Sequence, residues 1–323
     1  MKDYILLYGD KKKEDIICIK NMFQKNAKIN LGWTEIDYKK NSRLINTYIR
    51  KGVKLFVFLG LEVGWENLIK YIKKRDKDII IKVICNTQES LLYYDYEREN
   101  FFKLLSLSKK NMINEIAFLR KGQYEVYKKL GYKCSYLMPN YILEDKNKRE
   151  AKKKNEKIDI GIYPLNYTWD KNIFNQLCIA KFIENSNVNY NKLDERMTEF
   201  LNTMNIKCSE DKIGKINEEN IIKKIVKNDI NISCSFTEYF NTIFLLSMEQ
   251  GIPCLVGNTT DFFEENNELK KYVVTLAEDD CIINSNMVRT CLENKDKIMD
   301  LYKKWKERYN ELAERNKQVF LGM

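Results

Sequence analysis

The chain has 323 residues, of which 44% are hydrophobic and 32% are charged, and its formal net charge is +10. This composition is typical of a soluble globular protein and excludes a largely disordered chain. No apolar run approaches the roughly 20 residues of a membrane-spanning helix. The chain contains no histidine, which excludes Ser-His and Cys-His nucleophile pairs and the commonest zinc ligand. Any chemistry would have to use carboxylates, lysine, tyrosine or a group on the substrate.

The nine cysteines are scattered, form no Cys-x-x-Cys pair and mostly lie in apolar stretches. We therefore expect reduced thiols and a cytoplasmic location. The amino terminus has only the apolar run Tyr4 to Tyr8 before charges return, so we expect no signal peptide. Lys and Arg number 56 against 46 Asp and Glu. This excess favours anionic partners, such as nucleotide diphosphates, nucleic acid or anionic lipid, without choosing among them. Peripheral membrane contact stays open.

The length of the chain predicts two domains, because a single hydrophobic core rarely grows this large. The charged stretch 144–157 contains no large apolar side chain and predicts a linker. The sequence therefore predicts an amino-terminal domain over residues 1–143 and a carboxyl-terminal domain over residues 158–323.

The first half alternates apolar strand patterns with helical spacing. Strands are predicted at 4–8, 53–60, 79–85 and 115–119, and the segment 136–140 closes the domain. Helical spacing of apolar residues follows the first two strands and recurs over 123–130. It places on inward faces Ile16, Ile19 and Phe23 in one helix and Leu68, Ile69 and Ile72 in the next.

The second half restarts with a strand at 158–163, a turn at 164–168 and a helix, and further pairs of strand and helix reach 273–276. This alternation predicts an α/β fold with a parallel sheet and crossover helices in each half. The chain then ends in an amphipathic helix, which could pack on its own domain or cross back to the first. Its apolar stripe consists of Ile298, Tyr302, Trp305, Tyr309 and Leu312.

The segment 230–258 is the most informative stretch. Alternating apolar residues predict a strand through Cys234, Asn241 or Thr242 can begin a helix, and Gly251 with Pro253 ends it before another strand. In parallel sheets, ligands bind at the carboxyl ends of the strands, where backbone amides at a helix start attract anions. An anionic ligand rich in hydroxyl groups fits this pattern.

Two segments resemble the carboxyl-terminal domain of nucleotide-sugar glycosyltransferases with the GT-B fold. Residues 235–238 match the Ser-x-x-Glu of that family, and residues 251–253 match its closing Gly-x-Pro. Residues 169–177, Trp-Asp-Lys-Asn-Ile-Phe-Asn-Gln-Leu, resemble the start of that domain, where a lysine faces the donor diphosphate. The resemblance covers about half of the chain, roughly residues 157 to 320.

The resemblance implies two Rossmann-like domains facing a cleft, with the acceptor bound mainly by the first and the nucleotide-sugar donor by the second. It implies a retaining hexosyltransferase that needs neither a metal nor a cofactor besides its donor substrate. Lys171 and amides near Thr242 would stabilise the diphosphate, and Glu238 would orient the sugar hydroxyls. The matching segments also assign donor binding to Asn172, Tyr239, Phe240 and Asn241.

One position departs from the family pattern. The second glutamate that grips the donor ribose is expected eight positions after Glu238, where this chain has Leu246. Glu249 follows three residues later, about 60° around the helix from the expected direction. We expect Glu249 to reach the ribose only if the helix is rotated or extended.

Acceptor-side candidates follow two buried strands of the first half. They are Glu62 and Trp65 after the strand at 53–60, and Asn86 and Glu89 after the strand at 79–85. Either glutamate could act as a base if the reaction inverts, or serve only as a charge near a helix start. Asp-Lys-Asp at 76–78 matches a metal-binding pattern, but its neighbouring lysines favour a surface turn.

The sequence thus predicts a glycosyltransferase acting on an unidentified acceptor, which could be a glycan, a protein or a modified nucleic acid. Two alternatives remain open. The net charge and the 12% aromatic content would suit a nucleic-acid-directed protein, either a DNA-base glycosyltransferase or a binder, although no dense basic stripe is present. Leu246 would suit a catalytically silent relative that binds a partner protein.

Overall fold

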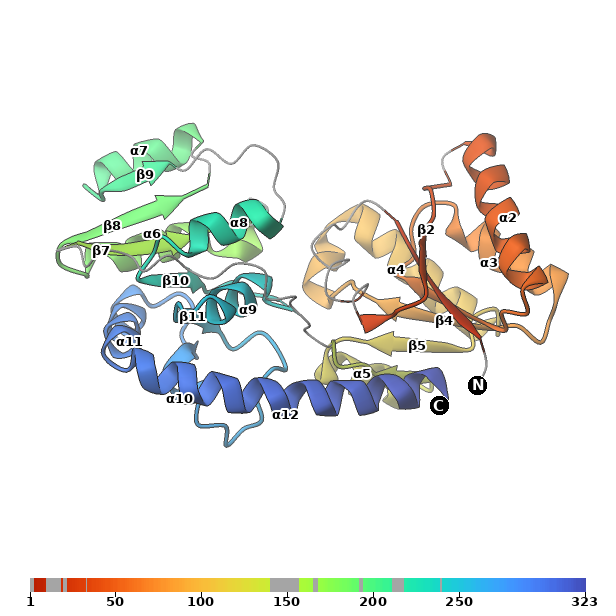
Figure 1. Cartoon of the computed structure of the whole chain (residues 1–323). Coiled ribbons are helices and arrows are strands. Elements are labelled where there is room, and N and C mark those ends of the chain that lie inside the picture. The colour runs from red at the N-terminus through yellow and green to blue at the C-terminus, as the bar shows by residue number, and fades with distance from the viewer. Residues whose placement is uncertain are drawn as a thin grey trace. The chain divides into compact units, whose positions relative to one another are not determined.

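The computed structural model describes residues 3–9, 19, 22–32, 34–139, 157–164, 168–191, 194–210, 218–238 and 240–323. The chain divides into two compact units (Figure 1). The first unit contains residues 1–142 and 309–323, and the second contains residues 143–308. The predicted linker lies, except for Lys157, outside the described residues, as do Ile16 and Tyr239.

The first unit is built on a parallel six-stranded sheet with the order β2-β1-β3-β4-β5-β6. The four strands predicted in this half are confirmed, with ends that differ by one or two residues. The short strands β2 and β6 were not predicted. The strand bounds are β1 Tyr4–Tyr8, β2 Asn26–Lys28, β3 Leu55–Leu59, β4 Ile80–Cys85, β5 Glu115–Phe118 and β6 Cys134–Tyr136.

The helices of the first unit cover this sheet through apolar faces. The helix α3 buries Trp65, Leu68, Ile69 and Ile72, which confirms the helical spacing seen in the sequence. Every residue of β3 is buried, as expected for a strand covered on both faces. The helix bounds are α2 Glu35–Arg50, α3 Trp65–Arg75, η1 Glu89–Tyr93, α4 Asp95–Lys109 and α5 Lys121–Lys129.

The second unit repeats this architecture with the strand order β12-β11-β10-β7-β8-β9, again all parallel. Helices α6 and α11 pack on each other, and so do α8 and α9. The strands are β7 Ile158–Ile162, β8 Ser186–Tyr190, β9 Cys208–Glu210, β10 Ile230–Ser233, β11 Cys254–Gly257 and β12 Val274–Thr275. The helices are η2 Trp169–Lys171, α6 Ile173–Lys181, α7 Glu195–Thr203, α8 Glu218–Ile225, α9 Thr242–Glu249, α10 Lys270–Val273 and α11 Cys281–Glu293.

The strand order of the second sheet reverses between β7 and β10. After β7 the chain adds β8 and β9 on one side, and then returns to add β10, β11 and β12 on the other. In open parallel sheets such a reversal leaves a crevice beyond the strand ends, because the connecting helices diverge to opposite faces. The loops after β7 and β10 therefore meet at the place where this architecture usually binds its ligand.

The last helix, α12 (Lys295–Leu321), belongs to both units. Its first part packs on the second unit, where Trp305 Nε1 donates to the Phe262 carbonyl at 2.9 Å. Its last part packs on the first unit, where Asn316 Oδ1 accepts from the Met138 amide at 2.7 Å and the Phe320 carbonyl accepts from Lys82 Nζ. Of the two expected arrangements, the helix thus adopts the one that crosses back.

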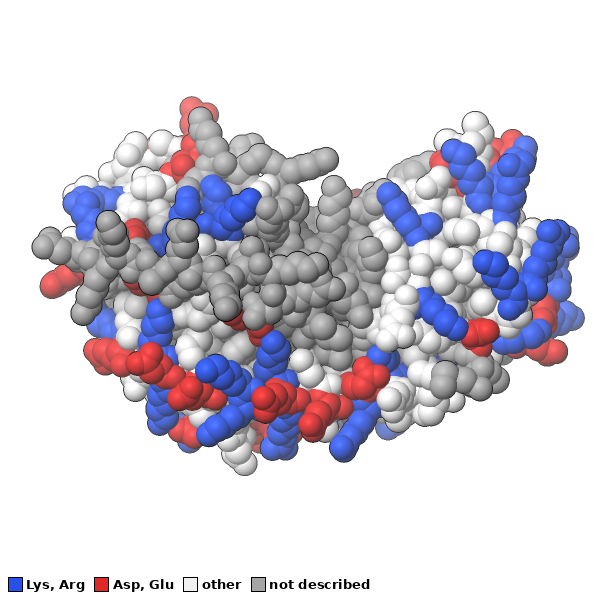
Figure 2. All heavy atoms as spheres, in the orientation of Figure 1, with Lys and Arg blue, Asp and Glu red and all other residues white. Residues whose placement is uncertain are grey.

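In the part of the chain that the structure describes, no helix is both long enough and apolar enough to cross a bilayer. The same residues include eight cysteines, all free thiols. On the face drawn in Figure 2, acidic and basic side chains alternate along α12, whereas Lys and Arg side chains gather over α2 and α3.

Candidate functional site

Lys171 and Glu238 meet at the reversal point of the second sheet. Lys171 ends the short turn η2 after β7, and Glu238 lies in the loop after β10. Lys171 Nζ lies 3.0 Å from Glu238 Oε2, and the two side chains are only 12% and 19% exposed. The sequence predicted both residues for one site, and the structure brings them into direct contact.

Lys171 ends the 3₁₀ turn η2 and does not lie in the first turn of α6. The next residue, Asn172, has a left-handed backbone with φ of 53° and separates η2 from α6. Asparagine adopts this conformation more readily than most residues, because its short side chain can form compensating local hydrogen bonds. The lysine therefore stands two residues before α6, on a tight turn.

Asn172 is buried and joins three segments. Its Nδ2 donates to the Cys234 carbonyl at 3.0 Å and to the Glu278 carbonyl at 2.7 Å, and its Oδ1 accepts from Asn175 at 2.7 Å. Gln176 repeats the connection, because its Nε2 donates to the Lys171 carbonyl and its Oε1 accepts from the Cys234 amide. These bonds hold the loops after β7, β10 and β12 in a fixed arrangement.

Asp170 is a member of the site that the sequence analysis missed. Its side chain is 4% exposed, its Oδ2 lies 3.8 Å from Lys171 Nζ, and its Oδ1 has no hydrogen-bond partner among the described residues. Its carbonyl accepts from the Phe236 amide at 2.8 Å, which ties this turn to the loop that carries Glu238. A buried carboxylate with an open oxygen is costly unless another group satisfies it.

Glu278 was also missed, although it follows β12 at the same edge of the sheet. Its Oε1 accepts from the Asn258 amide at 2.9 Å. A side chain at Gly257 would lie 2.8 Å from the Glu278 Cγ, so only glycine fits there without a shift. The strand predicted to reach 273–276 was the signal in the sequence, because Glu278 follows its end, but the pattern did not show that this carboxylate reaches the Asn258 amide.

Asn241 is the N-cap of α9. Of the two residues predicted to begin this helix, Asn241 or Thr242, the structure thus selects Asn241 as the cap. Its Oδ1 accepts from the Phe244 amide at 3.0 Å, and its Nδ2 donates to the Ser233 carbonyl and hydroxyl. The Thr242 amide donates to the Phe240 carbonyl at 3.1 Å. These amides of the first turn already have partners, so an anion at this helix start would have to compete with them.

Solved structures match the chain over its full length, although no protein-family model and no curated protein sequence matches it. Sucrose-phosphate synthase from Thermosynechococcus elongatus has a TM-score of 0.68 at 10% identity, covering 100% of both chains. The lipopolysaccharide outer core galactosyltransferase WaaB has a TM-score of 0.63 at 10% identity, covering 99% of this chain and 100% of the other. HepE from Anabaena, solved with UDP-glucose, has a TM-score of 0.64 at 8% identity, with coverage of 99% and 100%.

The chain has the GT-B fold. This confirms the fold predicted from the two short resemblances in its second half. The amino-terminal half, which resembled the family only in its rhythm of strands and helices, is part of the same match, since the alignments cover nearly all of the chain.

Glu249 lies at the far end of α9 from the Lys171 site. Its Oε1 accepts from Tyr302 OH at 2.6 Å and lies 2.6 Å from Lys306 Nζ, and both partners belong to α12. Burial and the neighbouring Glu249 carboxylate raise the pKa of Tyr302 well above its ordinary value. Leu246, at the position of the GT-B ribose glutamate, is 1% exposed and packs in the core. The contacts of Glu249 thus anchor the terminal helix and give no support to a role in ribose binding.

The acceptor-side candidates lie in two places, after β3 and after β4. Glu62 is buried after β3 and accepts a hydrogen bond from Tyr96 OH, and burial with this contact raises the pKa of Tyr96. Trp65 is fully buried, and its Nε1 donates to the Asn30 carbonyl at 3.1 Å. Trp65 is therefore a core residue of the first unit, because its ring is needed to fill the space above β3.

The remaining candidates lie after β4. Asn86 is buried, whereas Glu89 begins η1 and is exposed. The Asn86 side chain passes so close to Gly60 that a Cβ there would lie 2.8 Å from Asn86 Oδ1. At the Asp-x-Asp pattern, the Asp76 carboxylate is bound by Lys54 at 2.7 Å and by the Asp78 amide at 2.8 Å, which confirms a surface turn.

Proposed function

We propose that the chain is a glycosyltransferase that moves a hexose from a nucleotide-sugar donor to an acceptor hydroxyl. The observation that carries the proposal is the Lys171–Glu238 pair, part-buried beside Asp170 at the reversal point of the second sheet. The GT-B fold supports it, and the similar Anabaena HepE was solved in complex with UDP-glucose. A UDP-sugar is therefore the first donor to test.

Lys171 would exchange partners when the donor binds. In the structure its ammonium is neutralised by Glu238. A diphosphate offers more charge and more acceptor oxygens than a single carboxylate, so it would attract Lys171 and leave Glu238 to accept hydrogen bonds from the sugar hydroxyls. The Asn172 network would keep the turn that carries Lys171 and the end of β10 in place during this exchange, because its bonds do not involve either charged group.

The transfer then needs little further chemistry from the protein. The acceptor oxygen bonds to the anomeric carbon, the bond from that carbon to the diphosphate oxygen breaks, and the nucleoside diphosphate leaves. The acceptor proton passes to the departing phosphate, which suits a chain without histidine. We propose retention of configuration and no requirement for a metal, with Lys171 and amides near Thr242 stabilising the charge on the leaving group.

The decisive experiment is a mass-spectrometric screen for donor hydrolysis and transfer with UDP-, GDP-, ADP-, dTDP- and CMP-sugars. Wild type should consume one donor, and Lys171→Ala should spare it. Lys181→Ala is the matched control, because Lys181 is exposed on α6 of the same unit. Lys171→Arg keeps the positive charge and should retain more donor consumption than Lys171→Ala. The melting temperature of each variant shows whether it folds.

A catalytically silent protein is the outcome that would overturn the proposal. If no donor is consumed and none raises the melting temperature, the chain is a catalytically silent binding protein. The burial of Leu246 at the position of a ribose-binding glutamate would then explain the loss of activity. A DNA-base acceptor would appear instead as transfer to duplex DNA that weakens steeply with salt. We also propose a cytoplasmic location, which the free thiols of the described residues support.

A further inference from the structure

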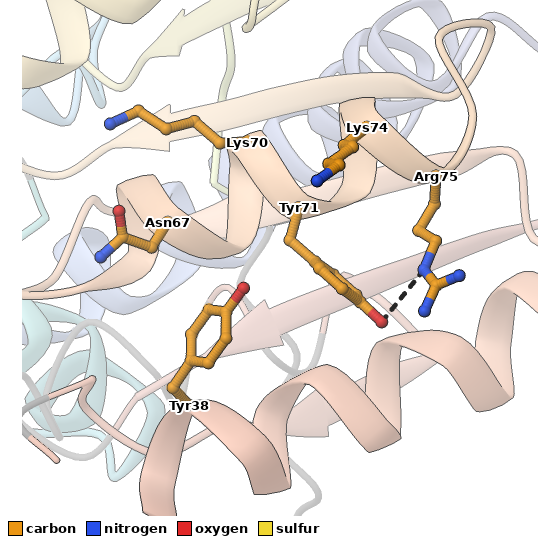
Figure 3. A pocket seen from close by; sticks show the side chains of 6 residues that line it. All are labelled: Tyr38, Asn67, Lys70, Tyr71, Lys74 and Arg75. Atoms are coloured by element: carbon orange, nitrogen blue, oxygen red, sulfur yellow. Dashed lines mark hydrogen bonds between the residues drawn. The ribbon is translucent and has the colours of Figure 1, made fainter. Parts of the chain in front are cut away.

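A basic pocket lies between α2 and α3 in the first unit (Figure 3). Its volume is about 650 Å³, comparable to that of sites for small organic ligands. It lies along the flanks of two helices, whereas the acceptor-side candidates follow the carboxyl ends of β3 and β4. The described residues that line it are Tyr38, Asn67, Lys70, Tyr71, Lys74 and Arg75.

Among the described residues, the pocket lining includes three cations and no carboxylate. Lys70 and Lys74 are exposed, and neither forms an ion pair or hydrogen bond with any described residue. By contrast, Lys73 of the same helix is bound by the Ile79 carbonyl and by Asn114. The helix α3 thus directs one lysine into internal contacts, whereas two others line the pocket without an ion pair among the described residues.

The tyrosines strengthen the case for a ligand that accepts hydrogen bonds. Tyr71 OH accepts from Asn46 Nδ2 at 2.7 Å and from Arg75 Nε at 3.2 Å, so both of its lone pairs are used and its proton remains to be donated. Figure 3 shows the Tyr38 hydroxyl on the pocket side of α2, and it has no partner among the described residues. The two rings contact edge to face at 6.2 Å.

Arg75 is held in place within the pocket. Its Cζ lies 5.3 Å from the centre of the Tyr71 ring, and its Nε is bonded to the hydroxyl of the same residue. This leaves the two terminal nitrogens of the guanidinium to bind a ligand. A guanidinium fixed in this way is well suited to phosphate, because it offers paired donors without a large loss of side-chain entropy.

We propose that this pocket binds the phosphate groups of a phosphorylated ligand. An anion complements a surface that carries two unpaired ammonium groups, a guanidinium and hydroxyl donors, and phosphate supplies several acceptor oxygens on one centre. The volume leaves space beyond a single phosphate. The same chemistry is offered by a soluble sugar phosphate and by the headgroup of an anionic lipid. The proposal does not depend on the proposed glycosyltransferase activity.

The test measures pyrophosphate binding by calorimetry in the Lys171→Ala background, so that the donor site does not contribute. The double variant Lys70→Gln/Lys74→Gln should bind roughly a hundredfold more weakly or worse, because each lost charge-assisted contact weakens binding by a factor of about ten or more. Lys103→Gln/Lys110→Gln, on an exposed face of α4 and just after it, is the control with equal charge loss and should bind as before. Tyr38→Phe should weaken binding several-fold without affecting folding.

A second arm distinguishes the source of the phosphate. Sedimentation with vesicles of phosphatidylcholine, with or without phosphatidic acid, tests the lipid headgroup. Binding only to the acidic vesicles, lost in the Lys70/Lys74 variant, assigns a membrane lipid, whereas pyrophosphate binding without vesicle binding assigns a soluble ligand. The proposal is wrong if wild type binds neither probe, or if the pocket variant and the control lose binding equally. Donor hydrolysis should be unchanged in the pocket variant, so the two proposals fail separately.

Discussion

Replacing Asn172 tests whether the site depends on one buried side chain. Asn172→Ala removes the donor to the Cys234 and Glu278 carbonyls and places a Cβ-bearing residue in the left-handed region at φ 53°. Asn172→Gly removes the same hydrogen bonds but tolerates the backbone conformation. The two variants therefore separate the hydrogen-bond contribution from the conformational one.

The expected magnitudes follow from the contacts. The Glu278 carbonyl keeps a second donor, Asn284 Nδ2 at 3.3 Å, so the main cost falls on the Cys234 carbonyl. A buried acceptor that loses its partner costs about 1–3 kcal/mol, and the left-handed conformation adds about 1–2 kcal/mol for alanine. We expect a loss of unfolding free energy of about 2 kcal/mol for Asn172→Gly and about 3–4 kcal/mol for Asn172→Ala.

Urea unfolding followed by circular dichroism measures both values, and hydrogen exchange of peptides locates the effect. If the two units unfold in separate steps, only the step of residues 143–308 should move. The control is Asn175→Ala, which removes only the bond to Asn172 Oδ1 and should cost less than either variant. Equal stability of the alanine and glycine variants, or losses below about 0.5 kcal/mol in both, would refute the reasoning.

Three further predictions concern other parts of the chain. Gly64→Ala should lower the free energy of unfolding, measured by thermal denaturation, by about 2 kcal/mol or more. The reason is that φ at this position is 78° and the new Cβ would lie 2.6 Å from Gly32 backbone atoms. Burial raises the pKa of the Cys291 thiol from 9.0 to about 12. The contribution of this thiol to the free energy of unfolding is therefore complete below pH 9 and is lost as the pH rises toward 12. In urea titrations over that range, the free energy of unfolding of wild type should fall by about 1.4 kcal/mol per pH unit more than that of Cys291→Ala. Tyr302→Phe should lower the unfolding free energy by about 1–2 kcal/mol, since Glu249 loses a 2.6 Å donor, and a loss below 0.3 kcal/mol would contradict this.

The long strands and their helices could be predicted because their apolar patterns are strong. The run at β3 is buried at all five positions, and the spacing on α3 matches its buried face. The strand β8, which is as long as β3, was missed because Ser-Asn-Val-Asn-Tyr mixes polar and apolar residues. Its asparagines are satisfied by side-chain hydrogen bonds, such as that from Asn189 to Asn228, which precedes β10, at 2.8 Å, and no local pattern reveals such partners.

The candidate site was predictable in its position and less so in its contacts. Lys171 and Glu238 are 67 residues apart in sequence, and only the parallel sheet with its reversal brings them together. Trp65 was misplaced because a strand end indicates that a residue lies near a cleft but not whether its side chain faces the core. Asp170 was overlooked beside Lys171 because its importance comes from burial, which depends on the loop after β10 packing over it.

The charge balance of the site limits how it can bind a donor. One ammonium, on Lys171, faces two carboxylates, on Asp170 and Glu238, and a diphosphate would add at least two more negative charges. Moving Lys171 from Glu238 to the phosphate does not change this sum, so other positive groups must compensate. The start of α9 supplies roughly half a charge through its amides, but the Thr242 and Phe244 amides are already bonded. For the start of α9 to stabilise the donor diphosphate, the Thr242 and Phe244 amides would have to leave the Phe240 carbonyl and the Asn241 side chain, and the binding energy of the diphosphate must cover the cost of breaking these bonds.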